Sequence, residues 1–108
     1  MESNYKTLNA NEFEQAISNS QVIVVDVRTA KEYASEHIAN AINIDMSSPD
    51  FIYEATAKLP KSRRIAIYCK SGTRSKMAAI LLANKGYNIL YLNGGITAWT
   101  NAGKNTAH

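Results

Sequence analysis

Residues 64–86 read RIAIYCKSGTRSKMAAILLANKG, and this stretch decides the fold. Its first five residues, Arg64–Tyr68, include the β-branched Ile65 and Ile67 and predict a buried strand. Beyond the loop, apolar side chains recur with helical spacing, which predicts a helix over Ser75–Lys85. Gly86 then stands where a left-handed helix cap belongs. A buried strand joined to a helix by a short loop indicates an α/β fold.

The same alternation of strand and helix signals continues on both sides of this stretch. Val22–Val27 is an apolar, β-branched run, as expected for a strand covered on both faces. Asn9 and Glu12 form a capping box before a helical pattern. The other expected elements are strands at 41–44 and 89–92, helices at 10–18 and 96–102, and a helix opened by Ser48-Pro49 and ended by Pro60. The tail from Lys104 is expected to fray.

These elements predict an α/β three-layer sandwich with a mainly parallel central sheet flanked by helices. The sequence contains no internal repeat, low-complexity segment or linker, so residues 1–108 are expected to form a single domain. In sheets of this kind, ligands bind at the carboxyl ends of the strands. The loop that follows Tyr68 is therefore the first place to look for a functional site.

The composition is that of an ordinary globular protein, with 108 residues that are 45% hydrophobic and 19% charged. It excludes a disordered or fibrous chain. No apolar run approaches the ~20 residues that span a bilayer. Met1–Asn4 lacks the basic and apolar start of a signal peptide, so the expected location is cytoplasmic, without a membrane partner. One Cys and two His form no zinc-type cluster, and no metal or organic cofactor is expected.

Charge is divided unevenly along the chain. Residues 1–54 carry three basic and nine acidic residues, a net charge of −6, whereas residues 55–108 carry nine basic residues and no acid, a net charge of +9. Scattered surface pairs between the two halves are one explanation. Around Cys69, however, Lys70, Arg74 and Lys76 favour a thiolate and an anionic ligand. The total of +3 is too small to suggest nucleic-acid binding, for which no basic face with interleaved aromatic residues is visible.

Residues 69–75, here called the Cys69 loop, carry the strongest chemical signal. Small and polar residues between a strand and a helix can turn successive N–H groups inward, and the helix adds the positive end of its dipole. Cys69 at the base of this ring is the candidate nucleophile. The candidate substrate-binding residues are Lys70, Ser71, Gly72, Thr73, Arg74 and Ser75. Among them, Gly72 permits the tight turn and Arg74 can bind an oxyanion with two donors.

A lone cysteine is more often a small buried apolar residue at a strand end. The cationic, small and glycine-bearing neighbours of Cys69 argue against that alternative.

Three separated motifs make the sequence resemble the rhodanese family over nearly the whole chain. The first comprises Asp26, Arg28, Glu32-Tyr33, His37-Ile38, Ala41 and Asn43-Ile44; the second, Cys69, Gly72 and Arg74-Ser75; the third, Leu92-Asn93-Gly94-Gly95, Trp99 and Gly103. One departure is Glu36, which stands where the family usually has glycine. It bears on the geometry of that turn and not on the nucleophile.

The resemblance implies a sulfurtransferase. Cys69 would take sulfane sulfur from thiosulfate or a persulfide, hold it as a persulfide, and pass it to a thiol, cyanide or a protein acceptor. Lys70 favours an anionic donor. Asp26, Arg28 and His37 are expected to support the site by hydrogen bonding and packing, with His37 as a general base the less favoured alternative. Trp99 and the Gly94-Gly95 turn are expected to set packing and backbone geometry beside the loop.

Two alternatives remain open. The chain could be a protein-to-protein sulfur carrier or interaction module, which would use the same motif. A cysteine-dependent phosphatase or arsenate reductase is disfavoured by loop length, because cysteine phosphatases have Cys-x5-Arg. Here four residues separate Cys69 from Arg74, and the smaller ring suits a single sulfur better than a phosphoryl group.

Overall fold

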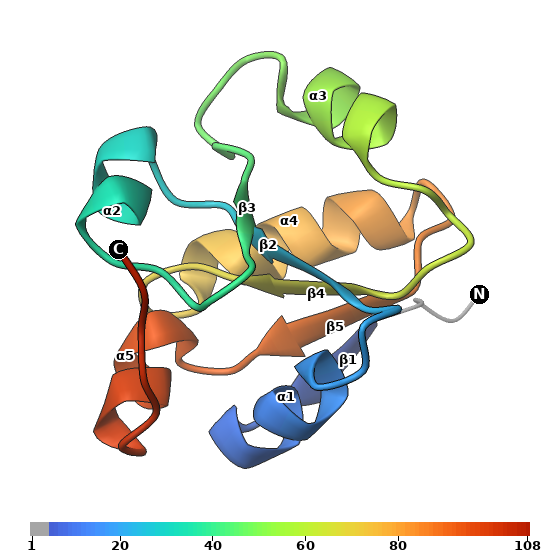
Figure 1. Cartoon of the computed structure of the whole chain (residues 1–108). Coiled ribbons are helices and arrows are strands. Elements are labelled where there is room, and N and C mark those ends of the chain that lie inside the picture. Colours follow the sequence, from blue (N-terminus) through green and yellow to red (C-terminus); the bar gives the residue numbers. More distant parts are fainter. Residues whose placement is uncertain (1–4) are drawn as a thin grey trace.

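Five short strands form one parallel sheet in the order β1-β5-β4-β2-β3 (Figure 1). They span Tyr5–Leu8 (β1), Ile23–Asp26 (β2), Ile42–Asn43 (β3), Ile65–Tyr68 (β4) and Ile89–Leu92 (β5). The structure is a computed structural model and describes residues 5–108. Because every strand pair is parallel, all carboxyl ends meet at one edge of the sheet, where Asp26 lies beside Tyr68 in register.

Helices on both faces of the sheet complete a three-layer sandwich, which confirms the predicted fold class. The helices span Ala10–Ile17 (α1), Ala30–Ser35 (α2), Phe51–Lys58 (α3), Thr73–Ala83 (α4) and Gly95–Asn101 (α5). In Figure 1, α1 and α5 lie below the sheet and α3 and α4 above it, while α2 lies at the carboxyl-end edge.

Two apolar cores follow from the alternation of side chains along the strands. In β4, Ile65 and Ile67 pack with α3 and α4, whereas Ala66 and Tyr68 pack with α1 and α5. All four are fully buried, so β4 is covered on both faces, as its continuous apolar sequence predicts. Cys69 continues the alternation and joins the core beneath α4.

The sequence does not predict β1 or α2. β1 is a four-residue edge strand in which only Leu8 is buried, so it lacks a long apolar run. α2 buries none of its residues and therefore has no apolar stripe. It does have a start signal, since Thr29 and Glu32 form a capping box. The predicted box of Asn9 and Glu12 at the start of α1 is confirmed.

Helix boundaries differ from prediction at three starts, of which α5 differs least, since it begins at Gly95 and not at Ile96. α4 begins at Thr73, two residues before Ser75, because Gly72 takes the cap position with a left-handed backbone. α3 begins at Phe51 and not directly after Ser48, whose hydroxyl accepts a hydrogen bond from Asp50 N and closes a turn first.

The left-handed cap predicted at Gly86 is confirmed, although α4 itself ends at Ala83, two residues before the predicted Lys85. Gly86 has a φ of 97°. Its N–H donates to Ala83 O, and Tyr87 N–H donates to Leu82 O, which together form a Schellman motif.

The tail does not fray, contrary to the sequence expectation. Lys104 Nζ lies 2.9 Å from a carboxylate oxygen of Glu14, and Trp99 Nε1 donates to Asn105 O at 2.8 Å. Ala107 exchanges two backbone hydrogen bonds with His37. The contacts with Glu14 and His37 join distant segments, which local sequence patterns do not encode.

Within residues 5–108, no helix has both the length and the apolar character that crossing a membrane requires. Met1–Asn4, on which the expectation about a signal peptide rests, lies outside the described residues.

Candidate active site

Cys69 is the first residue after the central strand β4, at the carboxyl edge of the sheet. It is 1% exposed and is the only cysteine in the chain. The strands on either side of β4 are β2 and β5, so the loops that follow all three meet around this residue. The structure therefore places the predicted nucleophile where ligands bind in parallel α/β sheets.

Hydrogen-bond donors surround the sulfur. Gly72 N–H and Ser75 N–H donate to Cys69 Sγ at 3.0 and 3.2 Å. The thiol lies 3.3 Å from Ser75 Oγ, and that hydroxyl donates to Gly72 O at 3.2 Å. When the sulfur is a thiolate, the Ser75 hydroxyl can turn its proton toward it. Two backbone donors and a hydroxyl at the start of a helix stabilise negative charge on sulfur.

Gly72 makes this arrangement sterically possible. Its φ is 108°, a conformation that side chains rarely adopt. A Cβ at this position would also lie 3.1 Å from Gly94 N, which belongs to the loop after β5. Gly72 thus turns its N–H toward the sulfur while packing closely on the neighbouring loop.

The start of α5 holds the Cys69 loop from the other side. Ile96 N–H donates to Cys69 O at 2.8 Å, and Thr97 N–H donates to Lys70 O at 3.0 Å. Gly95 brings the two segments together, since a Cβ there would clash with Cys69 O and lie 2.5 Å from Lys70 O. The carbonyl groups are bound by α5, and the N–H groups of Gly72 and Ser75 remain directed at the sulfur. The predicted geometric role of the Gly94-Gly95 turn is confirmed.

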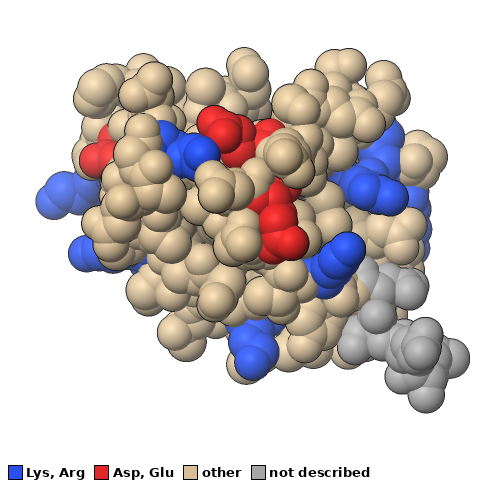
Figure 2. Space-filling model, turned by 90° about the horizontal axis from the view of Figure 1, so that it is seen from below, with Lys and Arg blue, Asp and Glu red and all other residues tan. Residues whose placement is uncertain are grey.

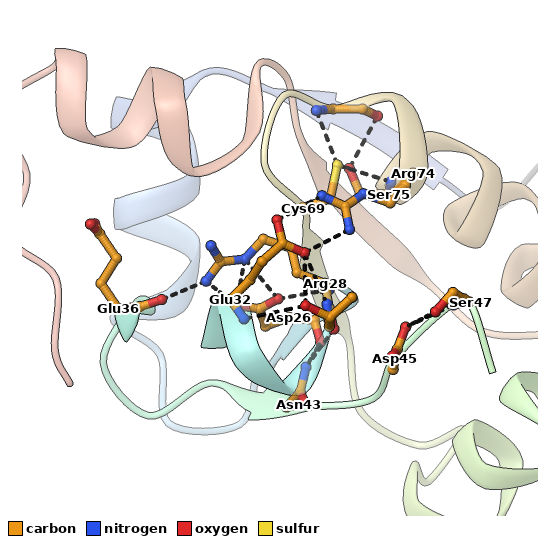
Figure 3. Close-up of polar contacts among 12 residues, drawn as sticks. Asp26, Arg28, Glu32, Glu36, Asn43, Asp45, Ser47, Cys69, Arg74 and Ser75 are labelled. Carbon is orange, nitrogen blue, oxygen red and sulfur yellow. Dashed lines mark hydrogen bonds and ion pairs between the residues drawn. The ribbon is translucent and has the colours of Figure 1, made fainter. Parts of the chain in front are cut away.

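Arg74 forms an ion pair that the sequence does not predict. Its two terminal nitrogens donate to the two carboxylate oxygens of Glu32 at 2.9 and 3.1 Å, and Figure 3 shows this pair beside Cys69 and Ser75. Glu32 Oε1 also accepts from Thr29 N and Thr29 Oγ1, each at 3.1 Å. The hydrogen bond from Arg74, assisted by those from Thr29, lowers the pKa of Glu32 to about 2. The same pair raises the pKa of Arg74.

Asp26 and Arg28 form a second, buried ion pair below the loop. Arg28 Nη2 donates to Asp26 Oδ2 at 2.8 Å and also binds Glu36 O. Asp26 and Arg28 are 0% and 4% exposed. Burial opposes the charge of Arg28, but the hydrogen bond and charge of Asp26 outweigh it and raise its pKa. Asn43 Nδ2 donates to the carbonyl oxygens of both residues. These bonds tie the loops after β2 and α2 together.

His37 packs at a turn. Its Nδ1 lies 2.9 Å from Tyr33 O, and its ring stacks on the Tyr33 ring with centroids 3.9 Å apart. None of its hydrogen bonds or ring contacts involves Cys69. Glu36, the departure from the family pattern, has an extended backbone with φ −167°, which any residue adopts. The turn therefore does not require glycine.

The remaining loop residues are exposed and line two shallow hollows. Lys70 lines one of about 290 Å³ together with Arg28, Glu32 and Glu36. Ser71 and Thr73 line the other, of about 360 Å³, together with Lys76, Met77 and Tyr91. The Cys69 loop forms the boundary between them. Among residues 5–108, no three Cys, His, Asp or Glu side chains come close enough to hold a metal ion.

Charge from the two halves of the sequence meets in space. Of the three ion pairs found among residues 5–108, Arg74–Glu32 and Lys104–Glu14 each join the basic half to the acidic half. Figure 2, a view onto α1 and α5, shows acidic groups toward the middle and basic groups around them, with no continuous patch of one sign.

The sequence does not predict the contacts that two site residues, Glu32 and Gly95, make. Glu32 belongs to the quoted motif without a role, and only its capping-box spacing from Thr29 indicates where it lies. Gly95 is expected to shape the turn, but its contact with Lys70 O depends on two distant segments meeting.

Comparison with known proteins gives a consistent picture. The family model of the rhodanese-like domain matches residues 9–102. A sulfurtransferase from Allochromatium vinosum is 40% identical over 83 residues, which cover 76% of this chain and 75% of that protein. The thiosulfate sulfurtransferase GlpE of Coxiella burnetii is 30% identical, covering 88% and 87%. The crystal structure of a rhodanese-related protein from Thermoplasma volcanium superposes with a TM-score of 0.84 at 32% identity, covering 95% and 98%.

Proposed function

Since the chain belongs to the rhodanese-like domain family, we propose that it is a sulfurtransferase in which Cys69 carries the transferred sulfur. One observation supports this most directly: the sulfur of the only cysteine accepts two backbone hydrogen bonds at the start of α4. Such donors stabilise a thiolate, and after transfer they stabilise the anionic persulfide on the same residue.

With thiosulfate as donor, the Cys69 thiolate attacks the outer sulfur. An S–S bond forms to Cys69, the S–S bond of thiosulfate breaks, and sulfite leaves with the bonding electron pair. Cys69 then bears an anionic persulfide. With an organic persulfide as donor, the thiolate takes the terminal sulfur and its proton, and the donor leaves as a thiolate. A thiol, cyanide or a protein nucleophile accepts the sulfur and regenerates the Cys69 thiolate.

The other loop residues have binding roles in this proposal. The amides of Gly72 and Ser75 hold the charged sulfur, and Ser71 and Thr73 offer hydroxyl groups at the mouth. Lys70 and Arg74 are the cationic side chains of the loop, and Arg74 meets an arriving donor as the partner of Glu32. Asp26 and Arg28 support the site by tying the loops after β2 and α2 together, and His37 packs on Tyr33 at the turn after α2, without touching the reacting atoms.

Intact-protein mass spectrometry tests this proposal. After brief incubation with thiosulfate or an organic persulfide, the wild-type protein should gain one sulfur atom that a reducing thiol removes. Cys69→Ser should gain none, because a hydroxyl group is not an adequate nucleophile at neutral pH. Sulfur uptake by Cys69→Ser, or none by the wild type from either donor, would exclude the proposed function.

The same protein can distinguish the alternatives. A sulfur carrier would turn over slowly with thiosulfate and cyanide yet exchange sulfur rapidly with a protein persulfide. A phosphatase or arsenate reductase would show Cys69-dependent hydrolysis of an aryl phosphate or reduction of arsenate without sulfur uptake. The four-residue spacing between Cys69 and Arg74 favours sulfur transfer over phosphate hydrolysis and arsenate reduction.

A further inference from the structure

The charge of Arg74 is already balanced in the structure. Both terminal nitrogens of its guanidinium bind Glu32, and the pair joins the Cys69 loop to the first turn of α2. Glu32 is itself fixed, because Oε1 accepts hydrogen bonds from Thr29 N and Thr29 Oγ1 in the capping box. A donor that approaches Cys69 therefore meets a positioned carboxylate along with the guanidinium.

In the hollow on the Glu32 side of the Cys69 loop, the other charged groups do not restore a positive excess. The hollow beside Lys70 is also lined by Arg28, Glu32 and Glu36, and Arg28 is paired with Asp26. At the same distance, an unpartnered arginine would attract a dianion about twice as strongly as a monoanion, since Coulomb energy scales with charge. The ion pair removes most of this advantage. Its carboxylate repels a dianion more than it repels a donor with one charge or none.

We propose that Glu32 is a specificity-determining residue that disfavours small dianionic donors such as thiosulfate relative to organic persulfides. The inference rests on the proposed sulfur transfer at Cys69 and names the donor class that the site favours. Glu32 acts through charge and through the position of Arg74, and it does not touch the reacting sulfur atoms.

Glu32→Gln tests the inference with little change in structure. A capping box accepts glutamate or glutamine at its third helical position, so the start of α2 is kept while one negative charge is removed. The donors are thiosulfate and the persulfide of 2-mercaptoethanol, whose only ionisable group is the persulfide. The ratio of kcat/KM for thiosulfate to kcat/KM for the persulfide should rise about fivefold, mainly through a lower KM for thiosulfate. An unchanged or lower ratio would overturn the inference.

Glu12→Gln is the matched control. Glu12 has the same place in the capping box of α1, where it hydrogen-bonds to Asn9. The substitution is chemically identical but lies at a helix start that does not contact the Cys69 loop. The donor ratio of Glu12→Gln should stay at the wild-type value. A ratio that rises equally in both variants would show an effect of net charge and would refute a role specific to Glu32.

Two further variants keep the test decisive even if Glu32→Gln is unstable. Arg74→Gln should raise the KM for thiosulfate, because it leaves the Glu32 carboxylate unpaired near the sulfur. The double variant, with glutamine at both positions, should have a lower KM for thiosulfate than Arg74→Gln alone. If Glu32 served only to align Arg74 for direct binding, the double variant would be no better than Arg74→Gln.

The same experiments test the proposed sulfur transfer at Cys69 separately from the inference about Glu32. Sulfur uptake by Cys69 from either donor maintains that function even where the Glu32 variants leave the donor ratio unchanged. In one outcome, the wild type uses the persulfide but neither the wild type nor Glu32→Gln uses thiosulfate. That result would refute the inference about Glu32 and leave the proposed function in place. Absence of uptake from both donors would remove the proposed function, and the inference with it.

Discussion

The helices α4 and α5 begin in the same way and use their first N–H groups differently. Each follows a glycine with a left-handed backbone, Gly72 with φ 108° and Gly94 with φ 81°, and neither has a side-chain cap. At the start of α4, backbone donors bind the sulfur of Cys69. At the start of α5, they bind the carbonyl oxygens of Cys69 and Lys70.

Two helices that do have side-chain caps show what this difference means. α1 and α2 begin with capping boxes, in which the side chains of Asn9 and Thr29 accept hydrogen bonds from the first turn. A side-chain cap uses donors that a ligand could otherwise reach. Glycine caps leave those donors free for other partners. Here the start of α4 directs its donors at the Cys69 sulfur, and the start of α5 uses its donors to hold the Cys69 loop in place.

Gly95→Ala should disrupt the start of α5, which holds the Cys69 loop, and should lower the rate of sulfur transfer more than substitution of Gly72 or Ser75. The new Cβ would clash with Cys69 O and lie 2.5 Å from Lys70 O. Because both are backbone atoms, the Cys69 loop must move, and misplacement by about 1 Å can cost roughly a hundredfold in rate. Sulfur transfer should fall by about that factor, measured as persulfide formation in single turnover.

Gly103→Ala is the control for Gly95→Ala. Gly103 also has a positive φ, 79°, but a Cβ there would have no atom within 4 Å. It should therefore lose about 1 kcal/mol of unfolding free energy from backbone strain and keep its transfer rate. Equal rates in the two variants would show that contact between α5 and the loop does not position the sulfur.

Gly72→Ala should disturb the start of α4, whose donors bind the Cys69 sulfur. An alanine at φ 108° is strained, and its Cβ would lie 3.1 Å from Gly94 N. The Gly72 N–H should turn away from the sulfur, and loss of a hydrogen bond to a charged group predicts a fall in transfer rate of roughly thirtyfold. Gly86→Ala is matched, because its φ is 97° and the nearest atoms belong to the flexible Lys61 side chain at 3.8 Å. A comparable rate loss in Gly86→Ala would point to general destabilisation.

The sequence predicts much of the start of α4 around the Cys69 sulfur, although it places the first helical residue at Ser75 and not at Thr73. The strand, the loop and the helix are contiguous in residues 64–86, so local patterns reveal Cys69, its donors and the need for glycine at position 72. The start of α5, which holds the Cys69 loop, is predictable only in outline. Its glycine pair is visible in the sequence, but the hydrogen bonds to Cys69 O and Lys70 O join segments more than twenty residues apart.

The same limit explains the elements that the sequence does not predict. β1 is polar and lies at the sheet edge, where pairing with β5 supplies the stability that its own residues lack. α2 has a start signal but no apolar stripe. It is tied to the rest of the molecule by the Glu32–Arg74 ion pair, whose partners are 42 residues apart. Local propensity cannot indicate such a contact.

Ser75→Ala separates the side-chain donor from the backbone donors at the sulfur. The variant removes the hydroxyl 3.3 Å from Cys69 Sγ and keeps the Ser75 N–H bond. Alkylation of Cys69 by iodoacetamide at neutral pH and sulfur transfer should both slow by about tenfold, the lower end for a hydrogen bond to a charged group. Ser18→Ala removes a hydroxyl that binds only Gln15 O, and should change neither rate. Wild-type rates in Ser75→Ala would leave the backbone donors as the whole source of stabilisation.

The smallest expected effect is on the free energy of unfolding, to which the ion pair between Glu32 at the start of α2 and Arg74 contributes. The pKa of Glu32 is about 2, below its usual 4.5, so the ion pair with Arg74 stabilises the fold above pH 4.5 and is lost as the pH falls through about 2. Because the Glu32 side chain is 29% exposed, solvent screening limits the gain to about 1 kcal/mol.

Urea unfolding of wild type and Glu32→Gln measures this contribution. The wild type should be more stable by about 1 kcal/mol near neutral pH, and the difference should shrink toward zero as the pH approaches 2. Glu12→Gln supplies the cost of the same substitution in the box of Asn9. A difference for Glu32→Gln that stays constant from neutral to acid pH would assign the effect to the α2 cap itself. The start of α2 would then add no stability through the Cys69 loop, unlike the start of α5, whose N–H groups bind that loop directly.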